Sequence, residues 1–310
     1  MSREWDEAVR QSRNGTFLLE RGYMDYHSDR FSDWSLVARR AGRIAGLLPA
    51  CRRDDTLYSH QGLTYGSWIV PFRHFDATVM TEIVDSSIDF MRSHGIGTLI
   101  YKPIPYIYHS YPADDDIYAL WRRGARLKEC NISTTIALDN PIPLDRGNKS
   151  GLKTAQRAGV EVAESADLAT YWHILEGVLK ERHSTQPVHT LSEITLLQSR
   201  FPKQIRLFAA TKGGRMVGGT LAYMCGPVAH CQYIAADAEG RELHALTAVF
   251  QHVAQVAKAE GCRYLDFGIS NEDHGRYLNA GLVQQKARLG GRGVAYNTFQ
   301  LDITDTTIDG

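Results

Sequence analysis

The residues best suited to chemistry follow an apolar run near the C-terminus. Asp266-Phe267-Gly268 ends a segment with the pattern of a buried strand, and Ser270 and Asn271 come shortly after it. Ligands of open α/β sheets bind at such strand ends. A carboxylate within an apolar strand also requires a polar partner. We therefore interpret Asp266 either as a catalytic base or substrate-binding group, with Ser270 and Asn271 contacting substrate, or as a structural hydrogen-bond acceptor.

Two cations lie in a hairpin predicted near the C-terminus. Its strands are Leu282–Ala287 and Val294–Leu301, and Gly290-Gly291-Arg292-Gly293 forms the turn. Lys286 is predicted to face a binding site from the first strand. Arg292 is either an ordinary turn residue or a contact to a phosphate group.

Two histidines flank a short turn in the second half of the chain. His183 and His189 enclose this turn, and Glu193 follows four residues later. Two imidazoles and a carboxylate can bind zinc, but nothing nearby completes a ligand shell, so we predict no metal. Because histidine titrates near physiological pH, one of them can transfer a proton or bind substrate. The alternative is that both order the loop through hydrogen bonds.

An aromatic segment occupies the equivalent position in the first half. It reads Tyr101-Lys102-Pro103-Ile104-Pro105-Tyr106-Ile107-Tyr108-His109. Its prolines exclude a regular helix. Planar aromatic rings suit sugar or nucleobase faces and Lys102 suits an anion, so we predict that Lys102, Tyr106 and His109 bind substrate. A rigid connector that packs on the sheet is the alternative.

The elements that carry these residues occur twice. Gly42-Arg43-Ile44-Ala45-Gly46-Leu47-Leu48 is echoed by Gly214-Arg215-Met216-Val217-Gly218-Gly219-Thr220. Each copy opens a similar order of three strands, a long helix and a buried strand. These are predicted at Ser35–Arg40, Arg43–Cys51, Leu57–Tyr65, Ala77–His94 and Gly97–Pro103, and again at Ile205–Thr211, Met216–Met224, His230–Ala235, Glu242–Glu260 and Cys262–Gly268. Self-similarity at so long a period indicates a duplicated domain and not a solenoid.

The repeat also aligns polar residues. If the two hairpins align without gaps, His60 matches Gln232, and if Leu265 matches Ile100, Tyr101 takes the place of Asp266. A polar group that recurs at one position indicates a site that faces substrate. We assign His60, Gln232 and the nearby Tyr65 to substrate binding on this basis.

A domain boundary is predicted in the run Asp139–Lys149, where two prolines and a glycine interrupt both periodicities. The predicted domains are residues 1–145 and 146–310. Helices are predicted after this boundary at Lys149–Ala158, Asp167–Arg182 and Leu191–Arg200.

Composition limits the classes of function. The chain has 35 basic and 35 acidic residues, so no global field attracts nucleic acid or an anionic membrane, and we predict no DNA partner. Its 5 cysteines are scattered without a CxxC pair, as expected of reduced, mostly buried thiols. No signal-peptide pattern or membrane span is recognised. We therefore predict a cytoplasmic protein without membrane insertion.

The order of elements resembles a known family. A hairpin, a long helix and a buried strand, present twice, is similar to the tandem GNAT fold of FemAB-like acyltransferases, in particular the BioF2-like acetyltransferases. The similarity extends over nearly the whole chain and rests on the segments Ser59–Gly66, Tyr101–His109, Arg182–Thr190 and Asp266–Tyr296. It implies an α/β fold of two GNAT-like domains, each a mixed sheet flanked by helices, that face a shared cleft.

The resemblance implies acyl transfer to a nitrogen atom. The expected donor is an acyl-coenzyme A, with acetyl-CoA as the first choice, and the expected acceptor is a small-molecule amine such as an amino sugar or a precursor of the cell envelope or of a natural product. By analogy with GNAT tyrosines, Tyr277, predicted on a short helix, and Tyr296, on the last strand, are candidate acids. The C-terminal half is expected to carry donor and chemistry, with Asp266 and His183 catalytic, while the N-terminal half helps to bind the acceptor.

Other readings remain open. GNAT domains hold the CoA pyrophosphate with an Arg/Gln-x-x-Gly-x-Gly/Ala loop, whereas the matching stretch here, Asp237–Glu242, has one glycine and three carboxylates. FemAB-like proteins share this departure, which leaves aminoacyl-tRNA as an alternative donor and tRNA as a partner. A non-catalytic binding protein of the same fold is the second alternative. The sequence does not indicate an oligomeric state.

Overall fold

The computed structural model describes residues 2–183 and 185–304, and its chain forms two compact units. Unit 1 comprises Met1–Asn131, Asn271–Tyr277 and Ala295–Gly310, and unit 2 comprises Ile132–Ser270 and Leu278–Val294. These limits differ from the predicted domains 1–145 and 146–310, because the last strand pairs within unit 1. Two strands, β6 (Arg126–Ala137) and β14 (Arg292–Asp302), have residues in both units.

Unit 1 is a small mixed sheet with a hairpin and helices. Its helices and strands are α1 Ser2–Arg10, α2 Arg21–Met24, β1 Leu36–Arg40, β2 Arg43–Leu48, β3 Cys51–Arg53, β4 Thr56–Tyr58, α3 Ala77–Ser93, β5 Thr98–Tyr101 and α4 Asp115–Arg122. β4 lies between β3, antiparallel, and β5, parallel, while β14 adds to β5 antiparallel. Asp76 caps α3 by accepting the N–H groups of Thr78 and Val79, and the apolar face of this helix packs into the core.

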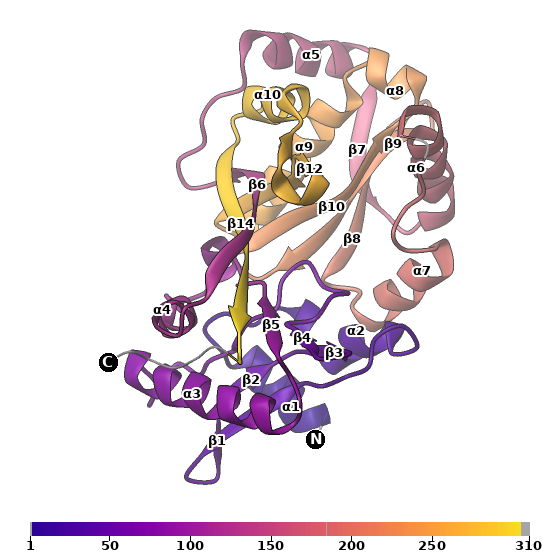
Figure 1. Ribbon diagram of the computed structural model, residues 1–310. Coiled ribbons are helices and arrows are strands. Elements are labelled where there is room, and N and C mark those ends of the chain that lie inside the picture. The colour runs from indigo at the N-terminus through magenta and orange to yellow at the C-terminus, as the bar shows by residue number, and fades with distance from the viewer. Residues whose placement is uncertain (1, 184, 305–310) are drawn as a thin grey trace. The chain divides into compact units, whose positions relative to one another are not determined.

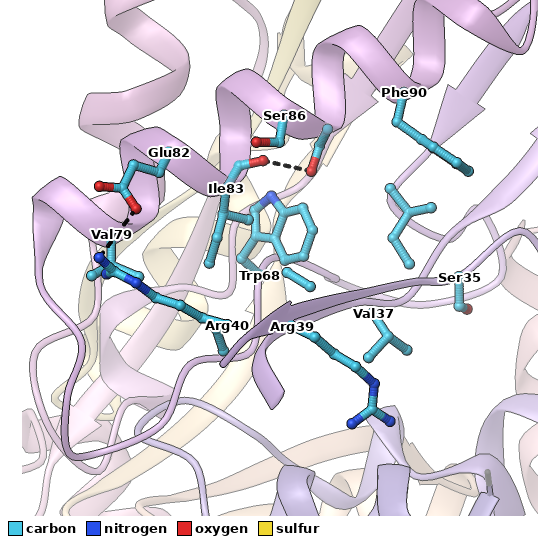
Figure 2. Close-up of a pocket in the computed structure, with 14 residues that line it drawn as sticks. Ser35, Val37, Arg39, Arg40, Trp68, Val79, Glu82, Ile83, Ser86 and Phe90 are labelled. Atoms are coloured by element: carbon cyan, nitrogen blue, oxygen red, sulfur yellow. Dashed lines mark hydrogen bonds and ion pairs between the residues drawn. The ribbon is translucent and has the colours of Figure 1, made fainter. Parts of the chain in front are cut away.

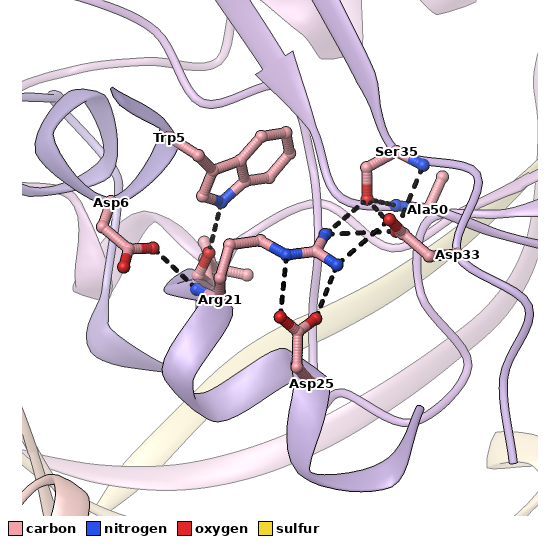
Figure 3. A network of polar contacts seen from close by, with 8 residues as sticks. Trp5, Asp6, Arg21, Asp25, Asp33, Ser35 and Ala50 are labelled. Atoms are coloured by element: carbon pink, nitrogen blue, oxygen red, sulfur yellow. Dashed lines mark hydrogen bonds and ion pairs between the residues drawn. The ribbon is translucent and has the colours of Figure 1, made fainter. Parts of the chain in front are cut away.

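An arginine fixes the N-terminal helices of unit 1. The Arg21 guanidinium bonds Asp25 at 2.5 Å and Asp33 at 3.0 Å, while its backbone N–H donates to Asp6 (Figure 3). The indole N–H of Trp5 donates to the backbone oxygen of Leu19 at 2.8 Å. Because the Arg21 side chain is mostly buried and bonds two carboxylates at once, this network fixes geometry better than an isolated surface ion pair does.

Unit 2 is a larger sheet with helices packed against it (Figure 1). Its further elements are α5 Arg146–Arg157, β7 Val160–Ser165, α6 Leu168–His183, α7 Leu191–Arg200, β8 Ile205–Lys212, β9 Arg215–Cys225, β10 Val228–Ala236, α8 Ala238–Glu242, α9 Ala245–Ala259, β11 Tyr264–Ile269 and α10 Ala280–Arg288. The strand order is β6-β11-β10-β9-β8-β7, and β10 and β11 form the parallel pair. This mixed sheet and its helices confirm the predicted α/β fold.

Alternation along the strands separates a core from a polar face. Ala229, Leu265 and Phe267 pack with α9 in one apolar cluster. The residues between them on the strands, His230 and Asp266, therefore point away from α9. Cys51, Cys225, Cys231 and Cys262 are buried, which confirms the prediction of mostly buried thiols. No helix within the described ranges is long and apolar enough to cross a bilayer.

The predicted hairpin near the C-terminus is wrong. Residues Leu282–Ala287 belong to α10, which Asn279 caps by accepting the N–H of Leu282 at 3.0 Å. Lys286 therefore projects from a helix, and the Gly290–Gly293 run joins that helix to β14. Tyr277, predicted on a short helix, lies instead in the short strand β13 (Tyr277–Leu278).

The predicted strand Leu57–Tyr65 is too long. β4 ends at Tyr58, and His60 has a φ angle of 59°, in the left-handed region that a strand does not use. The N–H of Leu63 then donates to the oxygen of His60 at 3.2 Å, which closes a turn. The long β6 and the helix α4 were not predicted, whereas the predicted helices at 77–94, 149–158, 167–182 and 191–200 are confirmed within two or three residues.

Two stacked histidines are buried in unit 1. His27 and His60 are 2% and 3% exposed, and their rings lie 5.2 Å apart at 16°. Among the described residues, neither Nδ1 atom has a hydrogen-bond partner. Burial, together with the neighbouring His27, lowers the pKa of His60 to about 4, and burial lowers the pKa of His27 as well.

We expect acidification to destabilise the protein through His60. Its pKa is 6.5 without the fold and about 4 within it, so the unfolded chain takes up the proton first. The stabilisation is therefore complete above pH 6.5 and is lost as the pH falls to about 4, by at most about 3 kcal/mol. His60→Asn, which tolerates the left-handed backbone, should flatten this loss in urea unfolding at stepped pH. The exposed His94→Asn should not, and an unchanged slope in His60→Asn would contradict the assignment.

Candidate active site

A histidine and an aspartate meet at the centre of the sheet of unit 2. His230 of β10 and Asp266 of β11 are register partners, and Nδ1 of His230 lies 2.7 Å from a carboxylate oxygen of Asp266. The carboxylate is fully buried, while the His230 side chain retains 13% of its exposure. The pair therefore has an inner, enclosed member and an outer member that can be approached.

Asp266 is surrounded by hydrogen-bond donors. The hydroxyls of Ser133 and Thr135, both on β6, donate to one oxygen at 2.5 and 2.6 Å, and the N–H of Gly268 reaches the other at 3.3 Å. Burial alone would raise the pKa of Asp266, but His230 and these hydroxyls outweigh it and hold the pKa below the usual value. Asp266 is therefore an ionised carboxylate, and the predicted requirement for a partner is confirmed.

A second buried carboxylate, Asp116, has no imidazole partner among the described residues and can be compared with Asp266. Asp116 in unit 1 accepts the hydroxyl of Tyr101 at 2.5 Å and the N–H of Ile117 at 2.8 Å. Burial raises the pKa of Asp116 to about 7 despite these bonds. The predicted match of Tyr101 with Asp266 is wrong, because Tyr101 packs in the core cluster with α3 whereas Asp266 points away from α9, and the parallel pairing ends at Ile100 in unit 1 and at Asp266 in unit 2. The imidazole at Asp266 accounts for the opposite direction of its shift.

The ionised carboxylate fixes the tautomer of His230. A carboxylate only accepts hydrogen bonds, so Nδ1 of His230 must carry the proton that it donates. In the neutral ring Nε2 is then left with its lone pair. A histidine oriented in this way by a buried aspartate is suited to accept a proton from a substrate.

Lys286 joins α10 to the end of β11. Its Nζ lies 2.8 Å from the oxygen of Gly268, 3.0 Å from that of Ile269 and 2.9 Å from the hydroxyl of Ser270. Burial lowers its pKa to about 8, although Asp266 and Cys231 act in the opposite direction. The three ammonium protons each have an acceptor, so the geometry gives Lys286 and Ser270 a positioning role at the mouth of the strand.

The parallel strands β10 and β11 separate beyond the His230–Asp266 pair, called the dyad below. In the described structure β10 and β11 are paired from Val228 and Tyr264 up to His230 and Asp266, yet β10 continues to Ala236. On the other edge of β10 the register passes from Cys231 to Tyr233, so Gln232 is the extra residue of a β-bulge. Bulges interrupt a ladder and occur next to active sites. The dyad thus lies where backbone groups of two strands become available.

His189, which comes just before α7, contacts a residue of β10. Nδ1 of His189 lies 2.6 Å from the hydroxyl of Tyr233, a residue that follows the bulge on β10. Glu193 completes a capping box with Thr190 at the start of α7. His183 ends α6, and its side chain lies outside the described residues. Within the described ranges, no cluster of three histidine, cysteine or acidic side chains is arranged to hold a metal ion.

Most of the predicted site residues of unit 1 form hydrogen bonds to neighbouring groups within that unit. Nζ of Lys102 donates to the oxygen of Leu63 at 3.0 Å, and Nε2 of the buried His109 lies 2.9 Å from the oxygen of Ile104. The hydroxyls of Tyr296 and Tyr108 are 2.9 Å apart, while that of Tyr65 lies 3.1 Å from Thr16. Tyr106 is exposed. Substrate binding by these residues stays a prediction.

Three further predicted residues lie outside these clusters. The side-chain amide of Asn271 donates to the oxygen of Gly275 at 3.2 Å, and Tyr277 is exposed. Arg292 is exposed and donates to the oxygen of Gly291 at 2.6 Å. Their roles as acid or substrate contacts stay predictions.

Unit 1 contains a pocket that is mostly apolar, unlike the polar surroundings of His230 and Asp266. A cavity of about 520 Å³ lies between the β1–β2 hairpin and α3 (Figure 2). Trp68, Val79 and Ile83 line it, and the ion pair of Arg40 and Glu82, at 3.5 Å, lies at its edge. Its walls are mostly apolar and hold no acid–base pair comparable to His230 and Asp266.

Sequence reasoning found Asp266 but missed His230. The histidine lies 36 positions away and appeared only as the first residue of a predicted strand. Ser133 and Thr135 belong to a strand that was not predicted at all. The parallel pairing of strands on either side of the long helix was the available signal, but its register was needed to align His230 with Asp266.

A family model matches part of the sequence, and several solved structures share the fold. Residues 146–276 match the family model described as an acetyltransferase (GNAT) domain. No curated protein sequence matches the chain. At the level of structure the chain is similar to FemX, with a TM-score of 0.72, 13% identity, and coverage of 97% of this chain and 96% of that one.

Two more solved structures share the fold. The C-terminal domain (DUF2156) of a putative lysylphosphatidylglycerol synthetase from Agrobacterium fabrum has a TM-score of 0.62 at 12% identity, covering 99% of this chain and 93% of that one. L-PGS from Bacillus licheniformis has a TM-score of 0.64 at 11% identity, with coverage of 98% and 93%. At these identities the likeness concerns the fold alone, and it confirms the predicted similarity of fold to Fem-type proteins.

We expect neutral His230 to carry its proton on Nδ1. Nitrogen-15 chemical shifts of the imidazole, recorded on labelled protein, report the tautomer directly. Asp266→Asn should weaken this preference, because an amide offers both a donor and an acceptor to the ring. The tautomer of His252, on α9, should not change in that variant. A proton found on Nε2 in the unmodified protein would contradict the geometry.

Proposed function

We propose that the protein is an N-acyltransferase whose chemistry lies in unit 2, because residues 146–276 match the family model of a GNAT acetyltransferase domain. The donor is an acyl-coenzyme A, with acetyl-CoA as the first choice, and the acceptor is the amine of a small molecule. One observation carries the proposal: the His230–Asp266 dyad lies where the parallel strands β10 and β11 separate.

The dyad supplies the proton acceptor that amine acylation requires. The amine nitrogen forms a new bond to the acyl carbon, the bond from that carbon to sulfur breaks, and the nitrogen must lose a proton. Nε2 of His230 accepts this proton. Asp266 stabilises the resulting imidazolium, because its buried negative charge lies 2.7 Å from Nδ1. The predicted role of Asp266 as the base thus passes to His230, with Asp266 as its positioning residue.

The bulge beside the dyad offers a group for the acyl oxygen. This oxygen gains negative charge as the nitrogen attacks, and a backbone N–H held in place stabilises that charge. Gln232 is the extra residue of the bulge, two positions from His230 on β10. We assign its main chain, and not the predicted side-chain contact, to this role.

The loop before α9 fits a donor with phosphate groups better than its composition suggests. Two of its carboxylates are neutralised, because Asp237 bonds Arg215 at 2.6 Å and Glu239 bonds Lys212 at 3.0 Å. A Cβ at Gly240 would lie 2.1 Å from the oxygen of Val217, so the loop requires glycine there. Helix α9 follows without a side-chain cap at His244, and its N-terminal N–H groups suit a pyrophosphate.

The matching gap in unit 1 is closed by the chain itself. β4 and β5 are parallel up to Tyr58 and Ile100, and the N–H of Ser59 then donates to the oxygen of Ile100 at 2.8 Å. The hydroxyl of Ser59 accepts the N–H of Lys102 at 2.7 Å, and Gly66 bonds Lys102 at 2.9 Å. These bonds fill the position that is open beyond His230. We therefore place one donor site in each chain, in unit 2.

An aminoacyl-tRNA is the alternative donor, supported by the shared fold with FemX. The balanced charge of the chain argues against it, since phosphate neutralisation supplies much of the affinity for nucleic acid. A binding protein without activity is the second alternative. Amino sugars and precursors of the cell envelope or of natural products are the acceptor classes to test first.

We expect one molecule of acetyl-CoA to bind per chain. Titration calorimetry measures the stoichiometry, and thermal unfolding should show stabilisation that grows with ligand concentration. Arg215→Glu should weaken binding, because it leaves Asp237 unpaired, leaves Glu239 paired with Lys212 alone and adds a negative charge beside the expected phosphates. Arg206→Glu, which breaks ion pairs to Glu164 and Glu260 elsewhere in unit 2, is the matched control. Two equivalents per chain would contradict the closure of unit 1.

We expect the dyad to be required for turnover. His230→Gln and Asp266→Asn should each lower the rate by roughly 100-fold or more, as for loss of a general base or its orienting partner. The assay follows thiol release from acetyl-CoA with glucosamine, lysine or spermidine as acceptor. His252→Gln, on the opposite face of the sheet, should keep its rate. Acetyl-CoA binding by His230→Gln would separate a catalytic defect from misfolding.

Two outcomes would overturn the proposed chemistry. Full activity in both dyad variants would remove His230 and Asp266 from the mechanism. Transfer of an amino acid from charged tRNA, with no response to acetyl-CoA, would establish the alternative donor.

A further inference from the structure

The corner between α4 and β6 in unit 1 exposes large apolar side chains. Tyr118 and Trp121 of α4 are 52% and 68% exposed, and Leu127 of β6 is 56% exposed. The two rings lie 6.3 Å apart. A tight turn, in which the N–H of Gly124 donates to the oxygen of Trp121 at 2.9 Å, brings the start of β6 next to the end of the helix. Exposed apolar clusters of this kind mark interaction sites.

Cations without partners lie beside these side chains. Arg126 and Lys128 are exposed, and they line one cavity together with Leu127. Within the described residues neither forms an ion pair. Arg122 and Arg123 share a single carboxylate, that of Asp85, at 2.7 and 2.6 Å. The corner therefore has an excess of positive charge, although the whole chain is neutral.

A cavity opens between the cations. Its volume is about 430 Å³, and its lining includes Arg123, Arg126 and Lys128 together with Gln300 and Asp302. Arg123 is paired with Asp85, so Arg126 and Lys128 are opposed in this cavity by the carboxylate of Asp302, and the remaining positive charge favours an anionic group. The exposed apolar side chains come from the same turn, so one ligand would have to offer both an anionic and an apolar part.

An anionic lipid surface has this combination. Tryptophan and tyrosine prefer the level of the lipid headgroups, where the ring body meets apolar chains and its polar edge meets water. Arginine and lysine beside them bind the phosphates of anionic lipids. Nucleic acid would satisfy the cations but not Leu127, and a second copy of the chain placed symmetrically on this corner would bring like charges together.

We propose that this corner, formed by Tyr118, Trp121, Arg126, Leu127 and Lys128, docks the protein on the surface of an anionic phospholipid membrane. Trp121 and Leu127 enter the headgroup layer, and Arg126 and Lys128 bind lipid phosphates. This is binding at the surface without insertion, and it does not depend on the proposed acyl transfer.

Co-sedimentation with lipid vesicles tests the proposal. The protein should bind vesicles of phosphatidylcholine with about 30% phosphatidylglycerol and bind pure phosphatidylcholine much less. The double variant Arg126→Glu/Lys128→Glu should weaken binding roughly 25-fold or more, from roughly fivefold for each cation. Trp121→Ala and Leu127→Ala should weaken it as well, with unchanged charge.

Matched controls separate this corner from general surface effects. Lys153→Glu/Arg157→Glu reverses two exposed cations on α5 of unit 2, and Tyr111→Ala removes an exposed aromatic side chain that lies 6.2 Å from Phe72 in another part of unit 1. Both should bind like the unmodified protein. All positions are exposed, and circular dichroism with urea unfolding checks that each variant folds.

Three results would overturn the proposal. These are no preference for anionic vesicles in the unmodified protein, an equal loss of binding in the control variants, and unchanged vesicle binding in the corner variants accompanied by weaker binding of total tRNA. The last would assign the corner to nucleic acid.

Discussion

The buried carboxylate of Asp266 is the constraint on which the arrangement of unit 2 depends. An ionised group without solvent is tolerated only if donors and a counter-charge surround it. The hydroxyls of Ser133 and Thr135 and the imidazole of His230 meet this need from the strands on either side. The register of β6, β11 and β10 is therefore tied to one side chain, because a shift by one residue would turn these donors to the other face.

The same strands leave one side of the His230–Asp266 pair accessible. Asp266 uses its charge to fix the proton of His230 on Nδ1, and this leaves Nε2 free of that bond. Immediately beyond the pair the strands separate, and Gln232 leaves the ladder. Lys286 secures the end of β11 through three acceptors, so the opening is held by a rigid edge. The hydrogen bonds around the buried Asp266 thus hold the partly exposed imidazole of His230 in place.

The two units show how one fold accommodates different polar groups. Where unit 2 has Asp266 at the end of the parallel pairing, unit 1 has Ile100, and the next residue, Tyr101, faces the core and donates to the buried Asp116. Without a cationic partner, burial raises the pKa of Asp116 to about 7. The gap between its parallel strands is filled by Ser59 and the turn at His60, which are bonded to Lys102 and Leu63. In unit 1 this position is filled by hydrogen-bonded chain, whereas in unit 2 it is open. This difference agrees with the GNAT match over residues 146–276.

The sequence by itself determined most of the helices and the hairpins that precede the long helices. Turn glycines, apolar periodicity and capping residues such as Asp76 and Thr190 act over a few positions, so helices and hairpins could be predicted from them. Asp266 could be singled out because a carboxylate in an apolar strand demands a partner. Only the tertiary structure decided which partner: His230 lies 36 positions away and Thr135 131. Strand register depends on the packing of all neighbouring strands at once, and the same packing decided that α10 is a helix and that Lys102 bonds Leu63.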